Sequence, residues 1–327
     1  MSTEKIKTVS GKELLDMNLP PIHFVVKGLV AQGLNIVSGM SKTGKSWMLL
    51  LMCLKVAEGK PFWNYETEKG TVLYLCLEDS YNRIQQRLLS FTDDAPPNLH
   101  FAVMANSLND GLGEQIEMFV AEHPDTKLIV IDTLQKIRDA SNDNAYATDY
   151  KDVGTLKEIA DRHGIAIVCV HHLRKMPADD PHKMVSGTTG LTGAADCSYV
   201  LMRNDPNSPD AKFYICGRDV EERVLSIKFD KENCTWEYVS GDTPAGDGLK
   251  SDAAMKTLIE YMQKENSFAG TVSELIEKLN LEIKNNILSK KLNQYETELK
   301  KLGIEFSKKR TGERREVLLT YTMPMTV

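Results

Sequence analysis

The sequence predicts an α/β fold with a mostly parallel sheet that continues into an antiparallel extension, and three observations support this prediction. Short apolar runs alternate with amphipathic stretches up to about residue 195. These runs are apolar at nearly every position, which is typical of parallel strands covered by helices on both faces. Beyond residue 195, strand-like runs follow one another without long helices between them, which favours antiparallel pairing.

The predicted elements follow one another in a regular order. Pro20 and Pro21 end a short helical pattern, because proline cannot continue a helix and restricts the residue before it to an extended conformation. Strands are then expected at 34–38, 71–77, 100–105, 127–132 and 165–172, and helices at 45–58, 80–90, 112–122 and 149–163. Four later runs, CSYVLM, AKFYICG, VLSIKF and CTWEYV, complete the sheet.

Changes in composition divide the chain into four parts. Residues 1–32 form an N-terminal extension, 33–240 a core, 241–250 a linker rich in Gly, Pro and Asp, and 251–327 a small separate unit. The chain of 327 residues is 42% hydrophobic and 26% charged. This composition is sufficient to bury a sizeable core and excludes a disordered or collagen-like protein.

Apolar stretches and cysteines bear on the location of the protein. The longest apolar stretch, 47–54, is far shorter than the roughly 20 residues that span a bilayer, and the N-terminus lacks the apolar core of a signal peptide. Six cysteines are spread singly through apolar runs, with no CxxC pair and no Cys/His cluster. We therefore expect reduced core cysteines, no structural zinc, no membrane contact and a cytoplasmic location.

The sequence contains a phosphate-binding motif. Residues 39–46 (GMSKTGKS) fit GxxxxGK[ST] directly after a predicted strand and at the start of a predicted helix, which is the context that the motif requires. Backbone N–H groups of such a loop surround phosphate oxygens, and the helix N-terminus adds partial positive charge. Lys45 is expected to reach the β- and γ-phosphates of ATP, and Ser46 to bind Mg²⁺. The candidate nucleotide-binding residues are Gly39, Met40, Ser41, Lys42, Thr43, Gly44, Lys45 and Ser46.

Two acids are candidates for the chemistry of hydrolysis. Asp132 ends the apolar run KLIVID, 87 residues after Lys45, and is predicted to position Mg²⁺ from a neighbouring strand. Glu78 follows the run 71–77, and an acid at the end of the strand next to the phosphate-loop strand would orient or deprotonate the attacking water. Asp79 is the second candidate for this role, although Asp79 or Ser80 is also suited to cap the next helix.

These motifs, in this order, resemble the RecA/DnaB superfamily of P-loop ATPases, and most closely the plasmid RepA-type hexameric replicative helicases and related mobile-element ATPases. The resemblance covers roughly residues 10–240 and rests on GLNIVSGMSKTGKSW, VLYLCLEDS, KLIVIDTLQKIR, IAIVCVHHLRK and SGTTGLTGAADCSYVL. It implies a RecA-like core that binds ATP and Mg²⁺ and hydrolyses ATP. It also implies a homo-oligomeric ring, expected to be a hexamer, with single-stranded DNA in its central channel.

The resemblance implies roles for residues outside the phosphate loop as well. His172 lies where DnaB-type proteins carry a glutamine that senses the γ-phosphate, and His171 is the alternative. The polar loop over 174–190 falls where the DNA-facing loops of the family lie. Lys175 and Lys183 of this loop are candidates for contacts with the phosphate backbone of DNA.

In ring-forming relatives, an arginine from the neighbouring subunit reaches the γ-phosphate from a late antiparallel strand, within a Lys-x-Arg motif. Arg218 is the matching residue here, although Cys216 replaces the lysine, and Arg203 is the second candidate. Because the positive charge of such an arginine stabilises the transition state, the active site would be shared between subunits.

The C-terminal unit carries much of the positive charge of the chain. The whole chain has a net charge of −6, and residues 284–327 contain ten Lys and Arg against five Asp and Glu, so the first 283 residues carry −11. Three helices at 252–265, 271–280 and 285–303, followed by a hairpin of strands at 304–308 and 316–322, form the layout of a winged helix. Thr271 and Glu274 fit a capping box at the start of the second helix.

Basic side chains crowd the third helix and the hairpin of this unit. Clustered positive charge on a helix and wing suits a duplex DNA backbone, and a protein partner is the alternative. The residues are Lys290, Lys291, Lys300, Lys301, Lys308, Lys309, Arg310, Arg314 and Arg315.

The sequence thus predicts an ATP-driven ring motor on single-stranded DNA, of the kind expected for a replicative helicase of a plasmid, phage or integrated element. Two alternatives stay open: a RecA-like recombination or strand-loading ATPase without unwinding, and a nucleotide-gated winged-helix DNA-binding regulator. A small-molecule kinase is less consistent with the sequence, because no arginine-rich lid-like insertion is present and Glu78 fits water activation.

Overall fold

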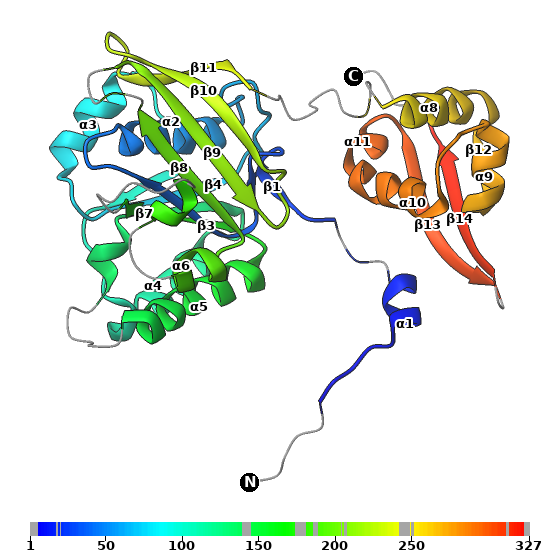
Figure 1. The fold of residues 1–327 in the computed structure, drawn as a ribbon, viewed down its shortest axis with the longest axis horizontal. Coiled ribbons are helices and arrows are strands. Elements are labelled where there is room, and N and C mark those ends of the chain that lie inside the picture. The colour runs from blue at the N-terminus through cyan, green and yellow to red at the C-terminus, as the bar shows by residue number, and fades with distance from the viewer. Residues whose placement is uncertain are drawn as a thin grey trace. The chain divides into compact units, whose positions relative to one another are not determined.

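The computed structural model describes residues 6–17, 19, 21–138, 145–173, 181–185, 189–203, 205, 208–241, 249, 252–311 and 314–323. The chain divides into two compact units (Figure 1). The larger unit spans Ile22–Gly246, and the smaller unit joins Met1–Pro21 to Asp247–Val327. Most of the predicted linker, 242–248, lies outside the described residues.

A mixed sheet of nine strands forms the centre of the larger unit, in the order β11-β10-β9-β8-β3-β7-β6-β4-β5. Neighbouring strands from β8 to β5 are parallel, and β9, β10 and β11 extend the sheet by antiparallel pairs. The predicted α/β fold with a mostly parallel sheet is thus confirmed. The strands are β3 (Gly33–Gly39), β4 (Thr71–Cys76), β5 (Leu99–Ala102), β6 (Thr126–Asp132), β7 (Ala166–His172), β8 (Cys197–Arg203), β9 (Asp210–Gly217), β10 (Arg223–Asp230) and β11 (Thr235–Ser240).

The strand order corrects two predictions about neighbouring strands. β7 lies between β3 and β6, so the strand that ends at Asp132 and the strand that precedes Glu78 are both separated from β3. β8 was expected to begin the antiparallel extension, but it pairs parallel with β3. The physical reason is the long connection between β7 and β8, which includes η3 (Pro181–Met184) and α6 (Thr189–Ala194) and is sufficient for a crossover.

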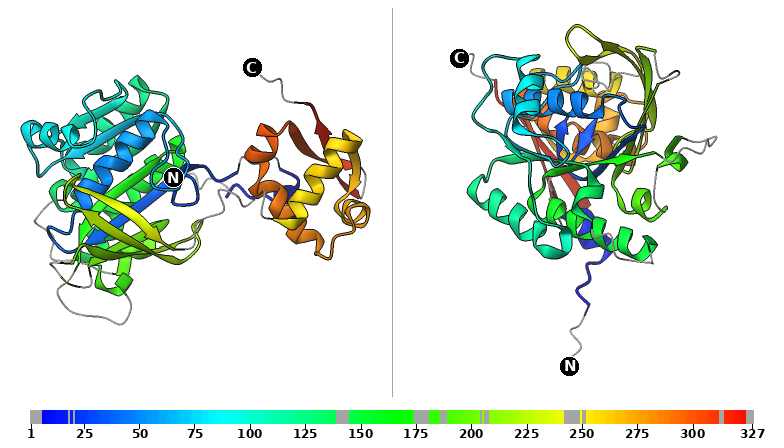
Figure 2. Two further views of the ribbon diagram at one scale, coloured as in Figure 1. Left: turned by 90° about the horizontal axis from the view of Figure 1, so that it is seen from above. Right: turned by 90° about the vertical axis from the view of Figure 1, so that its left-hand side faces the viewer.

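Helices cover both faces of this sheet (Figures 1 and 2). α2 (Lys45–Glu58) and α3 (Tyr81–Leu89) pack on one face, while α4 (Leu112–Glu122), α5 (Ala145–His163) and α6 pack on the other. Along β6, Leu128 and Val130 join the core under α2, whereas Ile129 and Ile131 join the core under α4 and α5. Burial on both faces explains why the strands are apolar at successive positions.

Shorter elements complete the larger unit. β1 (Phe24–Val26) and β2 (Val30–Ala31) form a small antiparallel pair after the predicted extended segment, and two 3-10 turns, η1 (Leu108–Asp110) and η2 (Leu134–Ile137), follow β5 and β6. Four cysteines are buried, but Cys216 is exposed and Cys234 is partly exposed, which corrects the prediction that all six lie in the core. Cys216 lies outside the core because inward- and outward-facing residues alternate along β9. Within the described residues, no helix has both the length and the apolar composition needed to cross a membrane.

The smaller unit contains helices and a three-stranded antiparallel sheet in the order β12-β14-β13. The segment 267–270 was expected to link two helices, but together with Thr271 it forms β12 because it pairs with β14. The predicted third helix is interrupted at Tyr295 and becomes α10 and α11. Its elements are α1 (Gly11–Asp16), α8 (Ala253–Glu265), β12 (Ser267–Thr271), α9 (Val272–Leu279), α10 (Asn285–Gln294), α11 (Glu296–Lys301), β13 (Ile304–Thr311) and β14 (Arg314–Tyr321).

The predicted capping box at the start of α9 is confirmed. Thr271 Oγ1 accepts a hydrogen bond from the backbone N–H of Glu274 at 3.2 Å, and Glu274 Oε2 accepts one from the N–H of Thr271 at 2.7 Å. This reciprocal pair satisfies two donors that a helix start otherwise leaves open. It fixes the point at which the chain leaves β12 and enters α9.

Candidate active site

The phosphate loop leaves the buried end of β3 and becomes the first turn of α2. All seven residues of β3 are buried. Gly44 caps α2 with a φ of 95°, a left-handed conformation that glycine adopts without strain. The first N–H groups of α2 have no partner within the helix, so the helix start can bind the oxygens of a phosphate group.

The side chain of Lys45 lies across the loop. Its Nζ donates hydrogen bonds to the carbonyl oxygens of Gly39 and Met40, each at 2.9 Å. Burial lowers the pKa of Lys45 to about 8, and the negative charges of Asp132 and Glu78 oppose this shift. Lys45, Glu78 and Asp132, which are far apart in the sequence, therefore lie in one site.

Ser46 and Asp132 meet at the carboxyl edge of the sheet. The Ser46 hydroxyl donates to Oδ2 of Asp132 at 2.6 Å, and the Tyr74 hydroxyl donates to the same oxygen at 3.0 Å. Burial raises the pKa of the Asp132 carboxyl, while these two hydrogen bonds lower it. A hydroxyl and a carboxylate in contact supply oxygen donors, and this set fits Mg²⁺, which binds one or two carboxylates together with substrate phosphates.

Glu78 lies just beyond the end of β4 and is held by the loop that follows β6. Thr133 Oγ1 donates a hydrogen bond to Oε1 of Glu78 at 3.1 Å. Thr133 is buried and directly follows Asp132, so one loop contacts both acids of the site. The next helix, α3, is capped by Ser80, whose Oγ accepts from the N–H of Arg83 at 3.4 Å. Glu78 is therefore outside the helix cap.

Asp79, the other acid proposed to orient water, is bound by α3. Its two carboxylate oxygens pair with Arg83 Nη1 at 2.7 Å and with Arg87 Nη1 at 2.5 Å. The Arg87 guanidinium also lies over the ring of Trp47, 5.5 Å from the ring centre. Because both oxygens of Asp79 are engaged by arginines, Glu78 is the better placed acid for contact with a water molecule.

β7 brings a histidine next to the first residue of the phosphate loop. In the parallel register of β3 and β7, His172 is opposite Gly39 and His171 is opposite Ser38. His171 is buried and His172 is half-buried. Among the described residues, Nδ1 of His172 is buried without a hydrogen-bond partner. An imidazole with an open ring nitrogen at this position can donate a hydrogen bond to a phosphate oxygen.

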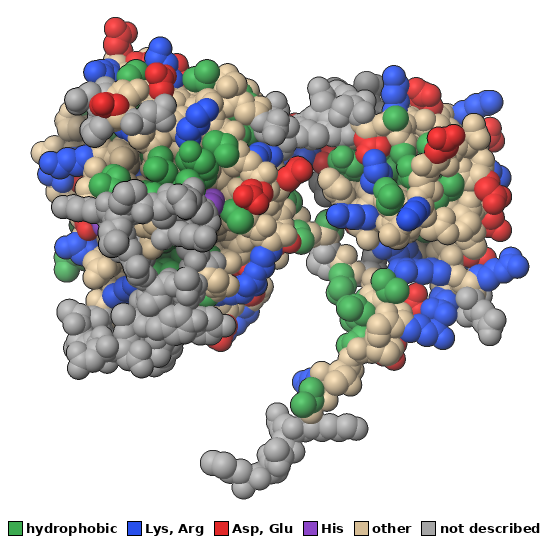
Figure 3. All heavy atoms as spheres, in the orientation of Figure 1, with side chains coloured by type: hydrophobic (Ala, Val, Ile, Leu, Met, Phe, Trp, Pro, Cys, Tyr) green, Lys and Arg blue, Asp and Glu red, His purple; other side chains and the backbone are tan. Residues whose placement is uncertain are grey.

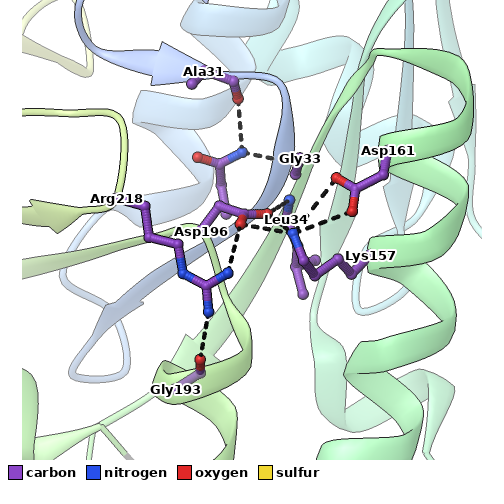
Figure 4. Close-up of polar contacts among 9 residues, drawn as sticks. Ala31, Gly33, Leu34, Lys157, Asp161, Gly193, Asp196 and Arg218 are labelled. Carbon is purple, nitrogen blue, oxygen red and sulfur yellow. Dashed lines mark hydrogen bonds and ion pairs between the residues drawn. The ribbon is translucent and has the colours of Figure 1, made fainter. Parts of the chain in front are cut away.

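Arg218 lies at the opposite edge of the sheet, just after β9. Its Nη1 is 3.5 Å from Oδ1 of Asp196, and its Nη2 donates to the carbonyl oxygen of Gly193 at 3.1 Å (Figure 4). Asp196 also pairs with Nζ of Lys157 at 2.5 Å and accepts from the N–H of Leu34 at 3.0 Å. β9 runs antiparallel to β8, and β8 is parallel to β3, so β9 ends at the amino edge of β3. Arg218 is therefore remote from the phosphate loop of its own chain, and its side chain is 58% exposed.

The remaining candidates from the core have different placements. Arg203 ends β8 beside the phosphate loop of its own chain, with Nη2 3.4 Å from the carbonyl oxygen of Thr43. The predicted DNA-facing loop over 174–190 lies largely outside the described residues, and so do Lys175 and the side chain of Lys183. Its described part contains η3 and a bridge between Leu173 and Val185.

Lys and Arg side chains gather on the smaller unit near the ends of β13 and β14 (Figure 3). Two of them, Arg310 and Arg315, contact the carboxylate of Asp16 at the end of α1, with N–O distances of 2.7 and 3.6 Å. Arg315 also donates a hydrogen bond to the carbonyl oxygen of Leu15. The N-terminal helix therefore neutralises part of the surface that the sequence predicted to bind DNA.

Two side chains that hold the acids were not predicted from the sequence. A polar residue directly after a strand-ending acid was a usable signal for Thr133, because it stands at the same edge of the sheet. Tyr74 gave no such signal, because a tyrosine within an apolar strand is usually a core residue. Its contact with Asp132 depends on the pairing of β4 with β6, in which Cys76 is opposite Asp132.

Comparison with known proteins finds a family model that matches the sequence and solved structures that have a similar fold. The chain matches the family model described as "AAA domain" over residues 2–178, which is more than half of its length. Among curated proteins, no sequence matches the chain at a significant level.

Two solved structures are similar to the chain. The first is described as an ATPase domain; it is 14% identical with a TM-score of 0.52, and the match covers 64% of this chain and 85% of that one. The second is described as a DnaB-like replicative helicase and its interactions with primase; it is 15% identical with a TM-score of 0.54. That match covers 67% of this chain and spans only 63% of the helicase chain. At these identities the likeness establishes a shared fold, the RecA-like α/β core that was predicted.

Proposed function

This chain belongs to the AAA domain family of P-loop ATPases, and we propose that it is an ATP-hydrolysing ring motor that acts on single-stranded DNA. Its expected role is that of a replicative-type DNA helicase of a plasmid, phage or integrated element. The observation that carries this proposal is the register of β3 and β7, which puts His172 beside Gly39. Because the loop over 174–190 begins two residues after His172, a change sensed at the γ-phosphate can be passed to a loop that contains several basic residues.

In this proposal, residues of the chain have distinct roles around bound ATP. Lys45 pairs with β- and γ-phosphate oxygens, while Ser46 and Asp132 would hold Mg²⁺, which supplies positive charge against the phosphates. Glu78, positioned by Thr133, orients the attacking water and accepts its proton. His172 donates to the γ-phosphate before hydrolysis and loses that partner afterwards, which alters the start of the following loop.

The position of Arg218 supports assembly into a ring. Arg218 is exposed and lies at the edge of the sheet away from its own phosphate loop, so it is available to a neighbouring subunit. Placed at the γ-phosphate of the neighbour, its charge would stabilise the transition state. Lys157 continues to pair with Asp196 when Arg218 leaves, so the Asp196 carboxylate still has a cationic partner. The resemblance of the sequence to ring-forming ATPases implies the same assembly, for which we expect six subunits.

The smaller unit supports an additional contact with duplex DNA or a protein partner. Its order of helix, strand, three further helices and two strands favours a winged helix, and its basic side chains suit a DNA backbone. These features favour a second candidate function, a nucleotide-gated DNA-binding regulator in which the ATPase is a slow switch.

One experiment distinguishes the two candidate functions. Steady-state ATP hydrolysis should be measured with and without single-stranded DNA for the wild type and for Glu78→Gln, with mass photometry of both in the presence of nucleotide. The ring motor predicts strong stimulation by single strands, a discrete six-fold species, and loss of turnover in Glu78→Gln. Negligible turnover, or a monomer or dimer without a response to DNA, would contradict the ring motor and favour the regulator.

A further inference from the structure

Two side chains that have no role in the proposed hydrolysis of ATP donate hydrogen bonds to carbonyl oxygens of the phosphate loop. Arg203 Nη2 donates to the carbonyl oxygen of Thr43 at 3.4 Å, and Trp236 Nε1 donates to the carbonyl oxygen of Gly44 at 3.2 Å. The two donors lie 160 and 192 positions further along the chain than the residues they contact. They come from β8, the parallel neighbour of β3, and from β11, the last strand of the antiparallel extension.

The strand register explains why both donors reach the loop. β8 is parallel to β3 with Leu201 opposite Gly39, so Arg203 stands two residues beyond the start of the loop. Trp236 lies near the start of β11, where it is opposite Phe229 of β10. β8 therefore brings a cationic side chain, and β11 of the antiparallel extension an aromatic one, to the edge from which the phosphate loop emerges.

The two donors also fix each other. The Arg203 guanidinium lies over the rings of Trp236 and Phe229, 5.0 and 5.3 Å from their centres. Trp236 is 1% exposed, and its own carbonyl oxygen accepts a hydrogen bond from Nε1 of Trp63 at 2.7 Å. Contacts between a cation and aromatic rings, together with close packing, restrict the conformations of both side chains. The donors are thus in place before a nucleotide binds.

We infer that Arg203 and Trp236 are positioning residues for nucleotide binding, because they orient the peptide groups whose N–H donors face the phosphates. In a trans peptide group, the C=O and the N–H point in opposite directions. The carbonyls of Thr43 and Gly44 belong to the peptide groups that carry the N–H of Gly44 and of Lys45. The Gly44 carbonyl also accepts the helical hydrogen bond from the N–H of Met48 at 3.1 Å, so Trp236 is a second donor there, while Arg203 holds the Thr43 carbonyl. Donors on these carbonyls direct both N–H groups into the loop and strengthen them as donors by polarisation.

Gly44 shows how closely the indole approaches the loop. A Cβ at this position would lie 2.8 Å from Nε1 of Trp236, closer than real Cβ contacts occur. Glycine at this position thus serves the left-handed turn and also leaves room for the donor of Trp236.

The same contacts show that Arg203 differs from an arginine that would act on a neighbouring subunit. Besides the carbonyl of Thr43, its guanidinium donates to the carbonyl oxygen of Ser208 at 3.2 Å and lies over two rings of its own chain. An arginine that reached another subunit would have to leave all of these contacts. Arg218 is exposed, and its guanidinium would leave two contacts, with Asp196 and with the carbonyl oxygen of Gly193.

The test compares nucleotide affinity with turnover in three variants of the full chain. Trp236→Phe keeps an aromatic ring and removes the donor, while Arg203→Lys keeps the charge and loses the planar fork. Tyr238→Phe is the matched control, because it removes a hydrogen-bond donor from the same strand, β11, whose partner is the carbonyl oxygen of Gly241 at 2.7 Å and not the loop. Isothermal titration calorimetry with Mg·ADP gives Kd, steady-state hydrolysis gives KM and kcat, and thermal unfolding reports whether each variant folds.

We expect Trp236→Phe and Arg203→Lys each to raise the Kd for ADP and the KM for ATP by about 3- to 10-fold, the loss expected for one hydrogen bond, with kcat within about twofold. Tyr238→Phe should leave all three values within about twofold of the wild type. Unchanged Kd in both test variants would overturn the role, and so would an equal rise in Tyr238→Phe, which would indicate general loss of packing.

A fall in kcat at unchanged Kd for Arg203→Lys would also overturn the role, because it would assign Arg203 to the transition state. Nucleotide binding at residues 39–46 is the only part of the proposed function that the role requires. Failure of the wild type to bind ADP would contradict both that binding and the role, whereas normal binding by the wild type and by all variants would contradict the role alone.

Discussion

Thr133 donates a hydrogen bond to Glu78 across 3.1 Å, although 55 positions separate the two residues in the sequence. Thr133 follows Asp132 directly, and the strands that end at Cys76 and Asp132 are paired neighbours. The end of β6 therefore carries the acid that would hold Mg²⁺, and the next residue fixes the acid that would orient water. The separation between these two acids is set by backbone pairing and a single side-chain contact.

Removing the hydroxyl of Thr133 should slow hydrolysis without weakening the binding of ATP. Thr133→Val keeps the size and branching of the side chain but leaves Glu78 without its donor, so the carboxylate would be less well oriented toward water. We expect kcat to fall by about tenfold, with KM within about twofold of the wild type. Thr133→Ser, which keeps the hydroxyl, should retain most of the activity. Equal kcat values for the Val variant and the wild type would show that Glu78 does not depend on Thr133.

Asp79→Asn should weaken the larger unit while leaving turnover nearly intact. The Asp79 side chain is 13% exposed and pairs with both Arg83 and Arg87, so loss of its charge leaves two arginines poorly paired. We expect the free energy of unfolding to fall by about 1–2 kcal/mol in urea titrations. Glu78→Gln is the contrasting variant, with turnover lost and stability retained. The opposite pattern would identify Asp79 as the acid that orients water.

The stability of the nucleotide-free protein should depend on Lys45 above pH 8. Burial lowers the pKa of Lys45 from 10.5 to about 8, so between these values the unfolded chain binds a proton that the folded chain has lost. Where the unfolded state holds more protons, the free energy of unfolding rises with pH. Below pH 8 both states are protonated, and the cost of burying the charge is constant.

Lys45→Met removes this titration and serves as the reference. In urea unfolding at about pH 7.5 and about pH 9.5, the difference in unfolding free energy between wild type and variant should shift toward a more stable wild type at the higher pH. A difference that stays constant would show that Lys45 keeps its proton in the folded state across this range.

Local signals account for much of what the sequence could predict. The phosphate loop could be predicted because its strand, turn and helix are contiguous, and Gly44, Lys45 and Ser46 lie at the start of α2 as expected. Acids after apolar runs were suitable candidates because the carboxyl ends of parallel strands share one edge. The insertion of β7 between β3 and β6 could not be predicted, since strand order depends on pairing across long distances. The contacts of Arg203 and Trp236 with the loop depend on the same long-range pairing.

The contact between Asp16 and the basic hairpin likewise had no signal in the sequence. If the smaller unit binds duplex DNA as proposed, Asp16→Asn should increase its affinity several-fold, because Arg310 and Arg315 are released for phosphate contacts. Affinity should also fall more steeply as the salt concentration rises, with the additional slope expected for about one to two more phosphate contacts. Fluorescence anisotropy of a labelled duplex at two salt concentrations measures both effects.

Glu13→Gln is the matched control for Asp16→Asn. It makes the same change of charge in the same helix, but the Glu13 carboxylate accepts from the N–H of Ser10 at 2.9 Å and belongs to the N-terminal cap of α1. Equal gains in both variants would indicate an effect of net charge alone. No binding of duplex in any variant would instead assign the smaller unit to a protein partner.

Arg218→Ala and Glu78→Gln should each be inactive, and a mixture of the two should regain activity. In the proposed ring, one subunit supplies Glu78 and its neighbour supplies Arg218, so random mixing in equal amounts leaves about a quarter of the interfaces with both residues intact. Lys157 still pairs with Asp196 when Arg218 is absent, so the Arg218→Ala variant should fold normally, which thermal unfolding would verify. Hydrolysis by the mixture should therefore exceed that of either variant alone, at the same total protein concentration and with saturating single-stranded DNA. Two inactive variants whose mixture is also inactive would place both residues in sites of the same chain, and because Arg218 lies far from its own phosphate loop, its role would then be structural.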